Sequence, residues 1–269
     1  PELPFSITFV NSRTVRIRLS AREQNLPHRE SIMLVSSELK GERWEIHEHN
    51  ELRTVYRSDH GMVAVVHDPW RIEFRDAAGR LLTRTRYPDE QKSPSVMSDF
   101  GFVRSVDDMR HFISASFLLS PGEKIFGAGE SFTKLDKRGQ KLNWFTFDPL
   151  SVQTQEMYKP IPFFFSSRGY GMFFHSSCPM TADFGHSFDS ANTIFVGDDE
   201  LDLFFFFGNP KDVISAYTEL TGRSEVPPLW SFGLWMSRIT YKSEKEVREV
   251  ADKLRKHRIP CDVIHLDTG

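Results

Sequence analysis

The sequence predicts a mainly β chain of two parts: a large antiparallel β-sandwich over residues 1–226 and the opening strand–helix–strand unit of a parallel α/β domain over residues 227–269. Three observations support this fold class. Short segments with the alternating period of a half-buried strand recur up to residue 208. The Pro227-Pro228 pair marks a boundary. Beyond it, one amphipathic helix stands between two apolar segments, which is typical of a βαβ unit.

The first 121 residues carry most of the strand signals. Apolar and polar side chains alternate over residues 14–19, so Val15, Ile17 and Leu19 are expected on one face and the polar side chains on the other. Residues 76–79 predict the tight turn of a hairpin, because the final glycine readily adopts the positive φ that such a turn needs. Further strands are predicted at residues 5–10, 62–67, 70–75 and 110–119.

Longer connections separate the strands that follow residue 125. Residues 143–159 form one long irregular segment, and loops of this size in compact domains are commonly functional. A helix is predicted over residues 211–221, because Asn209 can cap it, Pro210 suits its first turn and Gly222 ends it. Strands are predicted at residues 160–165, 171–175 and 201–207.

Residues 227–269 follow a different pattern. Apolar segments at residues 230–236 and 261–267 flank a helix predicted over residues 243–257, which Ser243 and Glu246 can open as a capping box. A lone βαβ unit cannot close a sheet, because each parallel strand needs neighbours on both sides and helices over its faces. We therefore expect the chain to be the front part of a longer protein.

The composition argues against several classes of partner. The chain has 34 Lys+Arg and 37 Asp+Glu, a net charge of −3, which does not favour nucleic acid or a membrane surface. No apolar run is long enough to span a bilayer. Cys178 and Cys261 are far apart, and we expect free thiols in a reducing, cytoplasmic compartment. The sequence has no phosphate loop, zinc-spaced cysteine pair or calcium loop, so we expect neither a cofactor nor a metal.

Four stretches, in this order along the chain, resemble motifs of the family-31 glycoside hydrolases. Residues 125–133 (IFGAGESFT) resemble the family's YGLGE-x-FT stretch in the sandwich, and residues 158–171 resemble its YKNIPFY-x-x-x-RGYG stretch. Residues 227–235 (PPLWSFGLW) are similar to the entry into the catalytic barrel, and residues 261–267 (CDVIHLD) to the second barrel strand. The resemblance covers residues 122–269, whereas the first 121 residues match only in strand pattern.

The resemblance implies a mutarotase-like sandwich that leads into a (β/α)₈ barrel. It implies exo-acting, retaining hydrolysis of terminal α-xylosides or α-glucosides, with an oligosaccharide or a small glycoside as the substrate and a possible homo-oligomer. The ending HLDTG is closer to the bacterial α-xylosidases. The family's nucleophile and general acid are two Asp residues on later strands, and no Asp here matches either motif. We therefore expect no catalytic residue and no hydrolytic activity in this chain alone.

The resemblance also indicates four substrate-binding candidates. Asp267 would lie at the tip of a parallel barrel strand and bind the terminal sugar, although it could instead be a loop acid or a helix cap. Thr268 would line the same pocket or belong to a turn. Trp235 would end the first barrel strand and stack on a sugar, although core packing is commoner there. Asp148 would reach the substrate from the long loop, unless Asn143 has that role or Asp148 serves only a turn.

A second class of function stays open. The sandwich could be a carbohydrate-binding or purely structural module without hydrolytic activity. A mutarotase would need its own His and Glu pair in the sandwich, and the sequence nominates none. The continuation of the chain into a barrel strand favours the enzyme.

Overall fold

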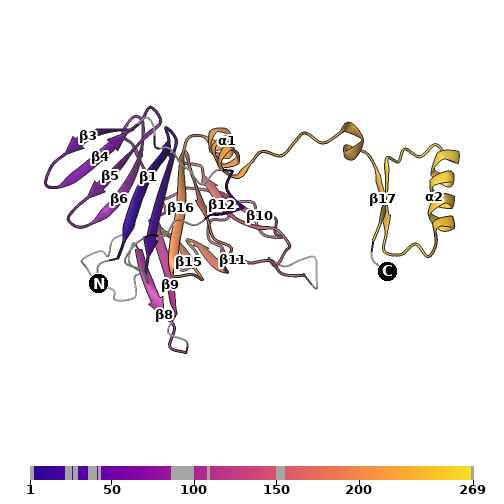
Figure 1. Ribbon diagram of the computed structural model, residues 1–269, viewed down its shortest axis with the longest axis horizontal. Coiled ribbons are helices and arrows are strands. Elements are labelled where there is room, and N and C mark those ends of the chain that lie inside the picture. Colours follow the sequence, from indigo (N-terminus) through magenta and orange to yellow (C-terminus); the bar gives the residue numbers. More distant parts are fainter. Residues whose placement is uncertain are drawn as a thin grey trace. The chain divides into compact units, whose positions relative to one another are not determined.

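The computed structural model describes residues 3–21, 26, 30–35, 41, 44–85, 100–107, 110–149 and 155–267. Contacts divide the chain into two compact units, Pro1–Gly222 and Arg223–Gly269. Antiparallel sheets make up most of the first unit, and a parallel strand pair with one helix makes up the second (Figure 1). The predicted fold class is therefore confirmed.

Three antiparallel sheets make up most of the described part of the first unit. In spatial order, the six-stranded sheet consists of β1 (Phe5–Asn11), β2 (Thr14–Ser20), β16 (Glu200–Phe207), β13 (Tyr170–Phe174), β12 (Pro160–Ser166) and β10 (Ile125–Gly129). One five-stranded sheet consists of β11 (Lys141–Trp144), β14 (Met180–Phe184), β15 (Ala191–Val196), β9 (His111–Leu118) and β8 (Phe100–Arg104). The other consists of β3 (Glu45–His49), β4 (Arg53–Arg57), β5 (Gly61–Val66), β6 (Arg71–Asp76) and β7 (Leu81–Arg84).

One apolar core joins the three sheets. Val15, Ile17 and Leu19 all lie in it, which confirms the alternation predicted for β2. Phe74 of β6 stacks on Phe205 of β16 with ring centroids 3.9 Å apart. Pairs of this kind explain the abundance of phenylalanine, because large rings fill the space between packed sheets.

Strand β16 is buried on both faces. Its odd-numbered side chains face the central core, whereas Phe204 and Phe206 pack under helix α1 (Pro210–Thr221). Asn209 caps α1 by accepting hydrogen bonds from the backbone N–H groups of Lys211 and Asp212, and Gly222 follows its end, as predicted. An apolar run of four phenylalanines is therefore a doubly covered central strand.

The second unit contains a 3₁₀ turn (Leu229–Phe232), β17 (Trp235–Arg238), α2 (Glu244–Lys256) and β18 (Val263–Leu266). The prediction of one strand over residues 230–236 is wrong. Pro228 C=O accepts hydrogen bonds from both the N–H and the Oγ–H of Ser231, and these bonds close a turn before the strand begins. Helix α2 is capped by Ser243, whose Oγ accepts from the N–H of Glu246, as predicted. The other half of the predicted capping box differs, because Glu246 Oε2 accepts from the N–H of Lys242 instead of Ser243.

Candidate functional site

Asp267 directly follows the carboxyl end of β18. Strands β17 and β18 are parallel, with Arg238 paired to Leu266, so both strands end at the same edge. Ser237 Oγ and His265 Nδ1 lie 3.0 Å apart, which places their side chains on one face of the pair. Continuing the alternation past His265 brings Asp267 to that face. Asp267 is exposed there, at the edge where parallel barrels place their ligands.

Trp235 lies at the other end of its strand. It is the first residue of β17 and pairs with Val263, so the prediction that it ends the strand is wrong. Arg238 lies three positions further along the strand, a distance of about 10 Å. Its indole Nε1–H donates to Ser231 C=O at 3.0 Å, and 47% of the residue is exposed. Trp235 shares a face with Ser237, although not the edge where the strand ends.

Thr268 lies outside the described residues. Asp148 belongs to the first unit, in the long connection between β11 and β12. The structure therefore places Trp235 and Asp267 in one unit, at opposite ends of the strand pair, and leaves Asp148 on a separate unit. It places Asn143 in β11, where its Oδ1 accepts from Thr181 Oγ at 3.5 Å.

The loop that carries Asp148 is tied across its base. The hydroxyl of Tyr158 donates to Asp148 Oδ1 at 2.7 Å, and the N–H of Phe147 donates to Met157 C=O at 3.3 Å. The hydrogen bond to the Asp148 carboxylate raises the pKa of the Tyr158 phenol. One carboxylate oxygen is thus occupied by Tyr158, and Asp148 itself is exposed. Sequence analysis missed Tyr158, although it stands inside the stretch 158–171.

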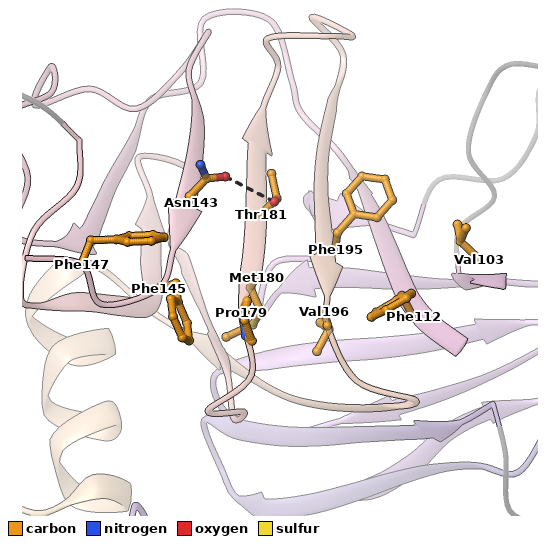
Figure 2. A pocket seen from close by; sticks show the side chains of 11 residues that line it. Val103, Phe112, Asn143, Phe145, Phe147, Pro179, Met180, Thr181, Phe195 and Val196 are labelled. Carbon is orange, nitrogen blue, oxygen red and sulfur yellow. Dashed lines mark hydrogen bonds between the residues drawn. The ribbon is translucent and has the colours of Figure 1, made fainter. Parts of the chain in front are cut away.

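An apolar groove of about 610 Å³ adjoins this loop (Figure 2). Its lining comes from all five strands of the β11–β14–β15–β9–β8 sheet and from the loop after β11. Phe145 and Phe147 contribute two edge-to-face rings with centroids 5.5 Å apart, and each side chain is about two-fifths exposed. Asn143 and Thr181 supply the polar groups (Figure 2). The volume and the aromatic lining lie within the range of small-ligand sites.

The described residues lack both a metal-binding group and a membrane-spanning helix. Among the residues that the structure describes, no group of three or more His, Cys, Asp or Glu side chains could hold a metal ion. No helix in this described part is long and apolar enough to cross a bilayer. Cys178 and Cys261 are free thiols.

Two family models match the chain. The glycosyl hydrolase 31 N-terminal galactose mutarotase-like domain matches residues 4–183, and the glycosyl hydrolases family 31 TIM-barrel domain matches residues 224–269. An α-glucosidase 2 of Bacillus thermoamyloliquefaciens is 34% identical over 209 residues, which cover 74% of this chain and 24% of that protein. The α-xylosidase XylQ of Lactiplantibacillus pentosus is 38% identical over 148 residues, 54% of this chain and 19% of that protein.

A solved structure agrees with these matches. A GH31 dextranase of Flavobacterium johnsoniae, complexed with isomaltotriose, superposes with a TM-score of 0.83 at 25% identity and covers 100% of this chain and 34% of its own. The chain thus spans between about a fifth and a third of the length of these relatives. The sandwich, the barrel entry and the match over residues 4–183 lead to one conclusion: the chain belongs to glycosyl hydrolase family 31.

Proposed function

We propose that this chain is the N-terminal part of a retaining, exo-acting α-glycosidase that hydrolyses terminal α-xylosides or α-glucosides. The observation that carries the proposal is the place of Asp267, an exposed carboxylate at the carboxyl edge of two parallel barrel strands. The names of the relatives, α-xylosidase and α-glucosidase, support the substrate class.

In this proposal the residues described here bind and orient the sugar. Asp267 accepts hydrogen bonds from hydroxyl groups of the terminal sugar, and Thr268 lines the same pocket. Asp148, on the first unit, stays a separate candidate for a sugar contact, and Tyr158 holds its carboxylate in one orientation. Trp235 contributes an aromatic face deeper along its strand. The nucleophile and the general acid come from later barrel strands, as a retaining mechanism needs two carboxylates about 5 Å apart.

The experiment compares this chain with a version extended through a complete barrel, using 4-nitrophenyl α-xyloside and α-glucoside. We expect turnover only by the extended version, and its preferred substrate identifies the sugar. Hydrolysis by the short chain would mean that the catalytic pair lies within it and would refute the proposal. No hydrolysis of either substrate by a folded extended version would refute it as well.

Variants of the extended version test the binding residues. Asp267→Asn is expected to lower kcat/KM by 10-fold or more, because a hydrogen bond to a charged group contributes about 1.5–3 kcal/mol. Asp262→Asn is the matched control, since Asp262 lies before the start of the same strand. An equal effect of both substitutions would show that Asp267 has no special role.

A second function is favoured by the groove in Figure 2, namely carbohydrate binding by the sandwich without hydrolysis. Exposed rings such as Phe147 can pack against the apolar face of a sugar. Calorimetric titration of the present chain with isomaltotriose would detect this binding. Loss of the signal in Phe147→Ala, but not in Phe188→Ala outside the groove, would support it, and no heat from the unmodified chain would refute it.

We also propose a cytoplasmic location and leave self-association as a further outcome to be measured. The free thiols of Cys178 and Cys261 support the location. Cell fractionation with an antibody against the chain tests it.

A further inference from the structure

Three side chains joined by hydrogen bonds lie outside the surfaces described above. Ser31 Oγ is 2.6 Å from His175 Nε2, and His175 Nδ1 is 2.7 Å from Asp202 Oδ2. The three residues are far apart in sequence, so no short sequence motif predicts that they meet. His175 and Asp202 meet because β13 and β16 pair and His175 N–H donates to Asp202 C=O at 2.8 Å.

The imidazole ring is held from several sides. Asp202 accepts two hydrogen bonds from Arg16, each at 2.7 Å, so the carboxylate cannot rotate away from His175. Burial raises the pKa of Asp202, but the hydrogen bonds from Arg16 and His175 outweigh it and hold this pKa below its ordinary value. Phe173 and Phe204 pack against the ring, with centroids 5.8 and 6.0 Å away.

These contacts fix which ring nitrogen serves as the base. An ionised Asp202 accepts the Nδ1–H of a neutral His175, so Nε2 carries the lone pair and can accept the hydroxyl proton of Ser31. The N–H of Met33 also donates to Ser31 Oγ, at 3.1 Å, and would stabilise negative charge on that oxygen. Hydroxyl, imidazole and carboxylate thus stand in the order that activates a serine nucleophile.

A small cavity opens beside the serine. Its volume is about 180 Å³, and Ser31, His175, Asp202, Arg16 and Arg18 are among its lining residues. This space corresponds to about six water molecules at roughly 30 Å³ each, which suits a group as small as an acetyl. Arg18 also lines this cavity, where its guanidinium lies 3.8 Å from the Glu200 carboxylate.

We propose that Ser31, His175 and Asp202 form a second site in the sandwich, which hydrolyses small, uncharged acyl esters such as acetate esters of alcohols. Ser31 Oγ attacks the carbonyl carbon while His175 Nε2 takes its proton. The ester C–O bond breaks, and the proton passes to the departing alcohol. Water then attacks the acyl-serine with His175 as base, which restores Ser31 and releases the carboxylic acid. Asp202 is a positioning residue. The site does not depend on the proposed glycosidase function.

The test is labelling of the unmodified chain with a fluorophosphonate probe, followed by peptide mapping. We expect the probe on Ser31. The chain carries a matched control in Ser237, which contacts His265 through Nδ1 instead of Nε2. A folded chain without labelled Ser31, or with Ser31 and Ser237 labelled equally, would overturn the proposal, because a serine that only anchors its segment is not activated.

Turnover of 4-nitrophenyl acetate adds a kinetic readout. Ser31→Ala should abolish the acyl-enzyme burst, and His175→Gln should slow acylation by about 100-fold or more. Equal burst and rate in Ser31→Ala and the unmodified chain would overturn the proposal. If His175→Gln does not fold, labelling of Ser31 in the unmodified chain is compared with and without urea. Activation needs the folded arrangement, so labelling that urea leaves unchanged would overturn the proposal.

Discussion

The ion pair between Arg16 and Asp202 makes a quantitative prediction about stability. Asp202→Asn keeps the shape of the side chain but removes the charge opposite a guanidinium that is only 14% exposed. Removing one partner of a buried ion pair costs about 3–5 kcal/mol, because the other charge stays desolvated. Since both side chains retain slight exposure, we expect a loss near the low end, about 3 kcal/mol.

The assay is urea unfolding followed by pulsed hydrogen exchange in peptides from β2 and β16, which reports on the first unit alone. The matched control is Glu130→Gln, which breaks the pair with Lys159 in the same unit. Those side chains are 68% and 67% exposed, so the expected loss is about 0.5 kcal/mol or less. A loss below about 1 kcal/mol for Asp202→Asn would refute the reasoning that burial determines the contribution of this pair.

The contribution of Asp202 to stability should depend on pH. The pKa of Asp202 is lowered in the folded chain from its ordinary value of 3.8, so the carboxylate stabilises the fold above that pH. This stability is lost as the pH falls through the folded pKa. The gap in unfolding free energy between the unmodified chain and Asp202→Asn should therefore be constant at neutral pH and shrink below about pH 4. A gap that stays unchanged on acidification would contradict the assignment.

Three further predictions concern single contacts. Tyr158→Phe frees Asp148 and, in a version extended through a complete barrel, should raise KM about threefold with little change in kcat, as one positioning hydrogen bond is lost; unchanged steady-state kinetics would contradict it. Gly61→Ala places a Cβ against the Phe207 ring and should cost about 1–3 kcal/mol in urea unfolding; unchanged stability would contradict this. Asn209→Ala removes the cap of α1 and should cost about 1 kcal/mol, detected as faster hydrogen exchange in the first turn.

Local signals in the sequence determined much of the fold. The alternation in β2 and the caps of α1 and α2 could be predicted, because each depends on side chains within one turn or one strand. Sequence motifs also indicated the family and Asp267, whose contact with a sugar stays a prediction.

The strand prediction failed where one local pattern is compatible with two backbone structures. The apolar residues 230–236 satisfy a buried strand as well as a turn, and backbone hydrogen bonds around Ser231 decide for the turn and move the strand start to Trp235. The apolar pattern of the sequence carries no information about those hydrogen bonds.

Tertiary structure alone decided which distant side chains meet. Tyr158 reaches Asp148 across a long loop, and His175 reaches Asp202 because β13 and β16 are neighbours in one sheet. The sequence by itself determined the fold class, the family, several strands and the two helices α1 and α2. Which residues face one another depends on strand register and loop closure, and these are set by contacts between segments that are remote along the chain.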